Sequence, residues 1–234
     1  MIRRWTVHGR PALLATLLIQ GVVLTLARPP VAPQSTPGLS AAAVVVRPLE
    51  APRPLRDGDR LTDDSRLQVS FSPDAEAWTA VLWFEEDRVQ ALYPDPHRGQ
   101  AGWTAPTTYA VPGPGEWLRL TPSRGEEFLA VVSASRPIGA IEQALSDPSP
   151  ARVRALRREL ESLAEARRGA LVGVERFLPT PDGRAVAVPW NHIVGAGPLV
   201  LGWRLTVESS AWLDPGTPSS SVQESPGPSS PNAS

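Results

Sequence analysis

Residues 67–84 read LQVSFSPDAEAWTAVLWF, and this stretch decides the fold class. Its first part alternates apolar Leu67, Val69 and Phe71 with polar residues, which is the period-two pattern of a strand with one solvated face. A Ser-Pro-Asp turn follows, and residues 77–84 are then nearly continuous in apolar side chains. Such a short apolar run predicts a central strand that is covered on both faces.

Similar strand patterns lie on both sides of this pair, and two helical patterns interrupt them. The further strands are predicted at residues 88–93, 107–111, 117–120, 127–134, 185–188 and 199–207. The first helical pattern covers about 138–145, and the second, over about 150–168, repeats Val153, Leu156 and Leu160 at helical spacing. Together these patterns predict a mainly β fold, an antiparallel sandwich or open barrel with one or two appended helices.

Composition divides the chain into four parts. Residues 1–27 are expected to be a signal peptide or signal anchor, and the proline-rich residues 28–54 an extended linker. The β-rich globular domain is predicted at 55–213, and it contains the helix at about 150–168. Residues 214–234 are rich in Ser and Pro with few apolar side chains, so we expect a disordered tail.

The N-terminus has the pattern of an export signal. Arg3, Arg4 and Arg10 precede an apolar run over residues 12–27, which is short for a bilayer span and ends in Thr-Leu-Ala. We expect cleavage after Ala27, which predicts a periplasmic or secreted protein. The alternative is an uncleaved anchor that holds the chain on the inner membrane facing the periplasm.

Charge and cysteine content exclude several classes of site. The formal net charge is −1, all basic side chains are Arg, and no Cys is present. The chain therefore has no disulfide, thiolate metal site or Cys nucleophile. Its near-neutral charge offers no footprint for nucleic acid, so we expect no such partner, and contact with a membrane only through an uncleaved N-terminal segment.

Several segments resemble one bacterial family. They are RDGDRL at 56–61, LQVSFSPD at 67–74, LYPD at 92–95, PGPGEWLRL at 112–120 and EFLAVVS at 127–133. Over about residues 55–140 the chain resembles domain of unknown function 4384, with Trp78, Tyr93 and Asp95 where that family favours Tyr, Phe and Asn. The resemblance implies an extracytoplasmic β module that often accompanies peptidase, kinase or secretion components, and it implies no catalytic residues.

No pattern of catalytic or metal-binding residues stands out. The histidines are His8, His97 and His192, and none forms a pair at metal-ligand spacing. His97 with Asp95 and Asp87 would make a small site only if their loops converge. The sequence has no G-x-S-x-G, H-E-x-x-H or phosphate-binding glycine loop, so we expect no enzyme, no metal and no cofactor.

Two tryptophans and one helix face are the candidate binding features. Trp103 and Trp190 fall in predicted loops, where large rings suit a binding surface. Trp78 and Trp83 lie an odd number of residues apart on one strand and should face opposite sides. The arginines of residues 150–168 alternate with acids, which favours a solvated, partly compensated face over a surface for a partner or anionic lipid.

These observations predict a non-enzymatic extracytoplasmic module that binds a protein or an envelope polymer. The first alternative is a membrane-anchored signalling or regulatory component that works with a peptidase or kinase. The second is a divergent hydrolase.

Overall fold

The computed structural model describes residues 36–95, 102–123, 125–168, 171–179 and 185–210. The predicted export signal, the predicted C-terminal tail and His97 lie outside these ranges. The elements are β1 (Gly38–Val46), β2 (Arg53–Pro54), β3 (Asp59–Thr62), β4 (Arg66–Pro73), β5 (Ala77–Glu85), β6 (Arg88–Tyr93), β7 (Trp103–Thr104), β8 (Tyr109–Val111), β9 (Leu118–Arg119), β10 (Glu126–Ala134), α1 (Gly139–Ser146), α2 (Pro150–Arg167), β11 (Val172–Pro179), β12 (Ala185–Val194) and β13 (Leu199–Glu208).

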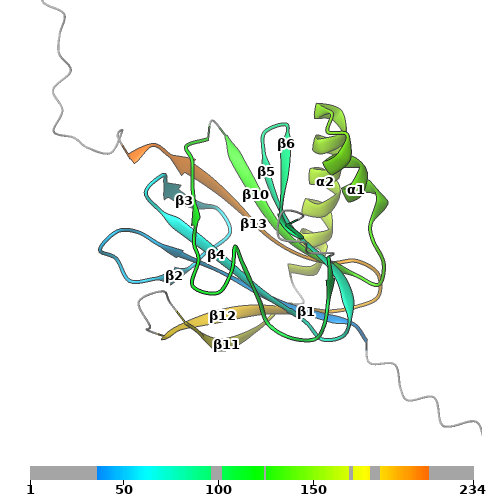
Figure 1. Ribbon diagram of the computed structural model, residues 1–234, viewed down its shortest axis with the longest axis horizontal. Coiled ribbons are helices and arrows are strands. Elements are labelled where there is room, and N and C mark those ends of the chain that lie inside the picture. The colour runs from blue at the N-terminus through cyan, green and yellow to red at the C-terminus, as the bar shows by residue number, and fades with distance from the viewer. Residues whose placement is uncertain (1–35, 96–101, 124, 169–170, 180–184, 211–234) are drawn as a thin grey trace, which may run out of the picture. The chain divides into compact units, whose positions relative to one another are not determined.

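The strands form two sheets, and neither closes into a barrel (Figure 1). One has the order β11-β12-β1-β4-β8, with β2 beside β1 and β9 beside β4. The other has the order β3-β13-β10-β5-β6, with β7 beside β5. All pairs are antiparallel except β13 with β3. The predicted mainly β class is confirmed, and the arrangement of the two sheets is consistent with a sandwich.

The main core lies between the two sheets. Alternate residues of each strand point into it, such as Val69 and Ala43 from one sheet and Val81 and Leu129 from the other. Trp83 packs against this core, whereas Trp78 lies on the opposite face of β5, as its spacing predicted.

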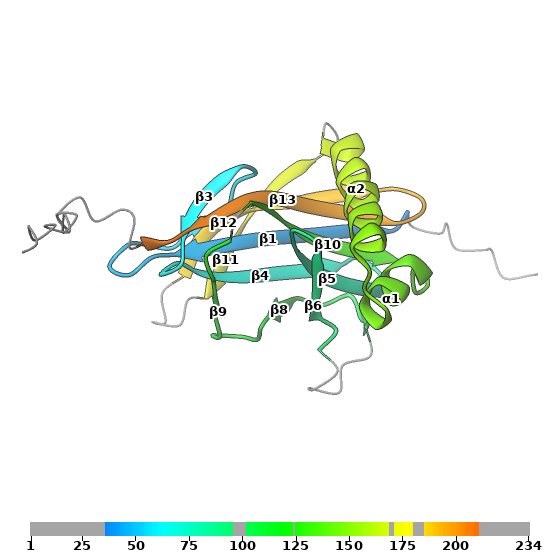
Figure 2. The same ribbon diagram turned by 90° about the horizontal axis from the view of Figure 1, so that it is seen from above.

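The two helices cover the outer face of the β10–β5 sheet, which makes a third layer (Figure 2). Val153, Leu156 and Leu160 of α2 are buried there with Phe84 and Phe128. The helix begins where the sequence predicts, with proline in its first turn and a cap in which the Arg152 N–H donates to the Ser149 hydroxyl. Strand β5 is therefore buried on both faces, as its apolar run predicts.

The predicted linker is wrong for residues 38–54. Strand β1 lies inside its sheet between β12 and β4, and nearly all of it is buried. Its sequence, GLSAAAVVV, is short in bulky residues and flanked by prolines, which is why the sequence predicts a linker there. The small side chains of β1 pack against the main core on one face and against Leu178, Val188 and Trp190 on the other. The globular domain thus begins before residue 38, not at residue 55.

The strand predictions at 67–71, 77–84, 88–93, 127–134 and 199–207 are confirmed within a few residues at their ends. Strand β12 continues to Val194, beyond the predicted 185–188. Strands β3 and β11 were not predicted. The first is short, and the second contains Gly173, charged residues and a terminal proline, so neither carries a clear apolar alternation.

Candidate functional site

Strand β11 is the end strand of its sheet, and within the described residues it pairs only with β12. In an antiparallel pair, alternate residues of an end strand direct their backbone N–H and C=O groups away from the partner. Three apolar side chains of β11 are also exposed, with exposed fractions of 58% for Val172, 42% for Val174 and 71% for Phe177. The strand therefore offers both backbone hydrogen-bonding groups and apolar surface to another chain.

Both faces of this edge contribute apolar surface. Val174 pairs with Trp190, and directly paired residues point to the same face of a sheet. Phe177 is an odd number of residues away from Val174 and lies on the other face. A strand added beside β11 would thus find an exposed apolar side chain above and below it.

A small cluster under β11 and β12 holds this edge in place. It consists of Ala42, Val44, Leu178, Val188 and Trp190, with Trp117 packed against it. The guanidinium carbon of Arg176 lies 4.8 Å from the centre of the Trp190 ring and covers it. These contacts give β11 a rigid support although its own side chains are mostly exposed.

The predicted exposure of Trp190 is wrong. Its side chain is 1% exposed, because residue 190 belongs to β12, where it pairs with Val174 and packs against Ala42 and Val44 of β1, rather than lying in a loop. Trp103 is exposed as predicted, at 48%, although it lies in the short strand β7 next to Trp78. The two tryptophans therefore do not form one surface, and only Trp103 is available for contact.

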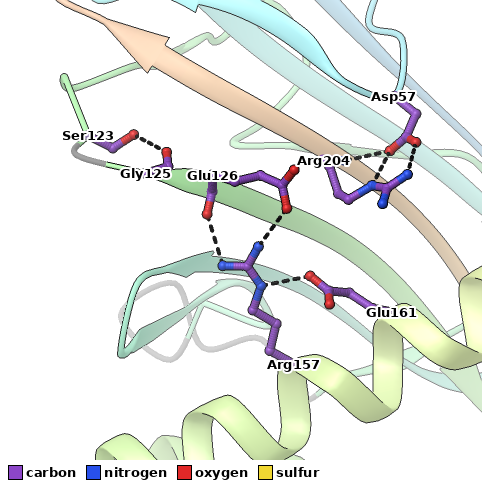
Figure 3. A network of polar contacts seen from close by, with 7 residues as sticks. All are labelled: Asp57, Ser123, Gly125, Glu126, Arg157, Glu161 and Arg204. Atoms are coloured by element: carbon purple, nitrogen blue, oxygen red, sulfur yellow. Dashed lines mark hydrogen bonds and ion pairs between the residues drawn. The ribbon is translucent and has the colours of Figure 1, made fainter.

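Two arginines of α2, Arg154 and Arg157, form ion pairs that link the helix to the β5–β10 sheet. Arg157 contacts Glu161 on its own helix at 2.7 Å and Glu126 of β10 at 3.2 Å (Figure 3). Arg154 pairs with Asp87 in the β5–β6 turn at 2.6 Å. A charge-compensated helix face is what the alternation of Arg and Glu predicted.

Asp57 joins the end of α2 to β13. Its carboxylate accepts from the Arg204 guanidinium and backbone N–H, as Figure 3 shows, and from Arg168 at 2.7 Å. Burial opposes ionisation of this carboxyl, but the hydrogen bonds from Arg204 and Arg168 outweigh it and lower the pKa to about 2. Its stabilising contribution is thus complete above the ordinary pKa of an aspartate and is lost as the pH falls towards 2.

Replacing Asp57 by Ala should lower the free energy of unfolding at pH 7 by about 2–3 kcal/mol, because two arginines lose a shared charged acceptor. Urea unfolding measures this loss. Asp87→Ala is the control, since that exposed ion pair should contribute less than about 1 kcal/mol. Equal losses in the two variants would show that Asp57, between α2 and β13, contributes no more to the free energy of unfolding than an exposed ion pair.

The fold also brings together a Ser, a His and an Asp that no sequence motif links. The Ser40 hydroxyl lies 2.8 Å from Nδ1 of His192, whose Nε2 is 3.7 Å from the carboxylate of Asp74. Ser40 is only 2% exposed, and a nucleophile must reach the carbonyl that it attacks. The contact therefore links β1, β12 and the end of β4, and it does not support acyl transfer.

Among the described residues, no group of three or more His, Cys, Asp or Glu side chains is arranged to hold a metal ion. The possible site of His97 with Asp95 and Asp87 stays a prediction, because His97 lies outside those ranges. Asp87 itself is paired with Arg154. No helix within the described part of the chain combines the length and apolar character needed to cross a bilayer.

Comparison with known proteins finds no matching family model, curated protein or solved structure. The resemblance to domain of unknown function 4384 stays a prediction.

Proposed function

We propose that this protein is a non-enzymatic extracytoplasmic module that binds a protein partner through β11, by pairing with an extended segment of that partner. The observation that carries the proposal is the edge of β11, which no other described strand covers, with its three exposed apolar side chains. Strand addition to a free sheet edge is a common mode of peptide recognition, in which main-chain hydrogen bonds provide affinity and side-chain contacts provide specificity. The export pattern of residues 1–27 and the family resemblance support an extracytoplasmic location.

A second copy of the chain fits this edge poorly. Two copies of β11 related by a two-fold axis would pair antiparallel. Directly opposed side chains lie on the same face of a sheet, so the residue on the axis must lie opposite the same residue of the other copy. The two registers with the longest overlap centre on Glu175 or Arg176. Each places two like charges opposite each other, which is unfavourable. A register centred on Val174 shortens the overlap to residues 172–176.

The edge instead suits a different sequence in extended conformation. Glu175 and Arg176 point to opposite faces, so a partner strand that places a basic residue opposite the first and an acidic residue opposite the second would be favoured. Apolar or aromatic residues would lie beside Val174 and Phe177. A charged polymer without a peptide backbone would leave the β11 hydrogen-bonding groups unpaired, which favours a protein over an envelope polymer.

We expect a photoreactive amino acid at position 177 to crosslink the full chain to a protein partner in its own host. The exposed ring of Phe177 would lie beside the added strand, whereas Leu49 is fully exposed in the turn after β1 and belongs to no strand of this edge. Position 49 is thus the matched control. Mass spectrometry of the adducts identifies the partner and its contact segment, and identical adducts from both positions would refute the proposal.

Val174→Lys should abolish that crosslink when introduced together with the probe, because a lysine on an edge strand opposes further pairing. Leu49→Lys should leave it unchanged. Val174 is exposed, so the fold should persist in the variant, and circular dichroism checks this. Retention of the same adduct in the Val174 variant would exclude strand addition at β11.

The alternative of a membrane-anchored signalling component, working with a peptidase or kinase, is favoured by the apolar run over residues 12–27. N-terminal sequencing of the protein from its host separates the two. A soluble species that begins near Arg28 supports a released module, and a membrane-bound chain that keeps Met1 supports the anchored component.

A further inference from the structure

A small cleft enters the sandwich near the start of β10, away from β11. Its volume is about 170 Å³. Residues of β5, β6 and β10 line it from one sheet, and β9 with the segment that follows lines it from the other. Trp83, Leu92 and Leu118 form its apolar part, whereas Gln90, Arg119 and Thr121 are exposed at its rim. The cleft therefore has an aromatic wall and polar groups at its entrance.

Glu127 lines this cleft and is the unusual residue in it. Alternation along β10 places Glu127 on the same face as Leu129 and Val131, which point into the core between the sheets. The residue is 2% exposed, and its Oε2 is buried with no hydrogen-bond partner among the residues that the structure describes. A buried carboxylate oxygen without a partner is unfavourable by a few kcal/mol, on the order of 1–3. A ligand with a donor at this position would remove that penalty.

The charge around Glu127 favours a cationic donor. Glu85 is its paired residue on β5 and lines the same cleft. Glu85 also lines a neighbouring hollow with Glu86 and Asp87 in the β5–β6 turn. Arg88 lines that hollow too, Arg119 on β9 lines the cleft, and Arg157 on α2 is already paired with Glu126 and Glu161. The lining of the cleft itself thus holds two carboxylates, Glu85 and Glu127, and one guanidinium, Arg119.

We propose that this cleft binds a primary ammonium group, with the Glu127 carboxylate as its main acceptor. An ammonium has three N–H donors, and the cleft offers Glu127, Glu85 and the Gln90 side-chain amide as acceptors. The Trp83 side chain lines the same cleft and contributes apolar surface for the alkyl part of such a ligand. This site is separate from the β11 edge, so it does not rest on the function proposed above.

The protonation of Glu127 should control this binding. Burial raises the pKa of Glu127 to about 7, the nearby Glu85 adds to the rise, and polar contacts from Ser123 and Trp83 oppose it. An ammonium ligand requires the charged carboxylate, so binding should release a proton. Because the charged fraction of such a group falls about tenfold from pH 8 to pH 6, affinity should fall by about the same factor.

The test is a titration of the folded protein with n-butylamine at pH 8, followed by the NMR signal of the Trp83 indole N–H. We expect a saturable shift in the millimolar range, about tenfold weaker at pH 6. Neutral n-butanol and NaCl at equal ionic strength should give no saturable shift. Equal shifts with butanol or NaCl, or binding that does not change with pH, would overturn the proposal.

Two variants and a second ligand complete the test. Glu127→Gln should lose the butylamine response, while Glu126→Gln, its neighbour on the opposite face of β10, should keep it. Unchanged binding by Glu127→Gln would exclude Glu127 as the acceptor. Binding of Nα-acetyl-lysine amide tests whether the ammonium group belongs to a protein lysine or to a small amine. Binding about tenfold tighter than butylamine supports the site and indicates a protein lysine, and equal binding supports the site and indicates a small primary amine.

Discussion

Trp190→Ala is expected to lower the free energy of unfolding by about 3–5 kcal/mol, the usual loss when a large buried aromatic side chain is truncated. Trp190 fills the cluster beneath β11 and β12, and the Arg176 side chain covers its ring. The loss would be a large part of the total stability of an ordinary domain, about 5–15 kcal/mol. Urea unfolding followed by circular dichroism measures it.

The matched control is Trp103→Ala, which makes the same chemical change at a ring that is 48% exposed. We expect a loss below about 1 kcal/mol there, as for most changes at exposed positions. If the two variants lose equal stability, the placement of the Trp190 side chain in the buried cluster is wrong. The support of β11 would then need another explanation.

Glu127→Gln is expected to stabilise the protein at pH 8 by roughly 2–3 kcal/mol, which is the cost of keeping a charge at this buried position. The pKa of Glu127 is raised in the folded state, from 4.5 to about 7. Between these values the folded chain holds a proton that the unfolded chain has released. The free energy of unfolding should therefore fall as the pH rises from about 5 to 7 and then level off.

Unfolding in urea at pH 5, 6, 7 and 8 tests this dependence. The Glu127→Gln variant should match the natural chain at pH 5 and exceed it at pH 8, because a neutral amide has no charge to bury. Glu126→Gln is the control, since Glu126 is exposed and pairs with Arg157. Its pH profile should have the slope of the natural chain. A natural chain with equal stability at pH 5 and pH 8 would contradict the prediction.

Strands with a strong local pattern were predictable from sequence. In β5 the apolar run is long enough to require cover on both faces, and the structure provides it with the second sheet on one side and the helices on the other. Helix α2 was equally clear, because its proline, its Ser149 cap and its apolar spacing all indicate the same start.

Strands that depend on their neighbours were not predictable. Strand β1 consists largely of alanine and valine between proline-rich segments, and only pairing with both β4 and β12 makes it a central strand. Strand β11 carries exposed apolar residues, a glycine and charges, so its extended form depends on β12. In both cases the stabilising contacts come from segments distant in sequence, which no local pattern records.

Some properties of the candidate sites were likewise predictable from the sequence, and others were not. The exposure of Trp103 followed from its position among turn residues, whereas Trp190 was assigned to a loop because β12 was predicted too short. Glu127 was predicted to lie in a covered strand, but nothing in EFLAVVS shows that its carboxyl faces the cleft between the sheets. Its side chain direction depends on the register of β10 with β5.

By itself, the sequence determined the mainly β class, the position of α2 and the absence of any cysteine chemistry, because these follow from composition and from local periodicity. Only the tertiary structure decided that β1 is an inner strand, that no described strand covers the edge of β11 and that the Glu127 carboxyl is buried. Those properties depend on pairing between segments far apart in the chain, and such pairing is favoured by burial over the whole sandwich rather than by any single stretch.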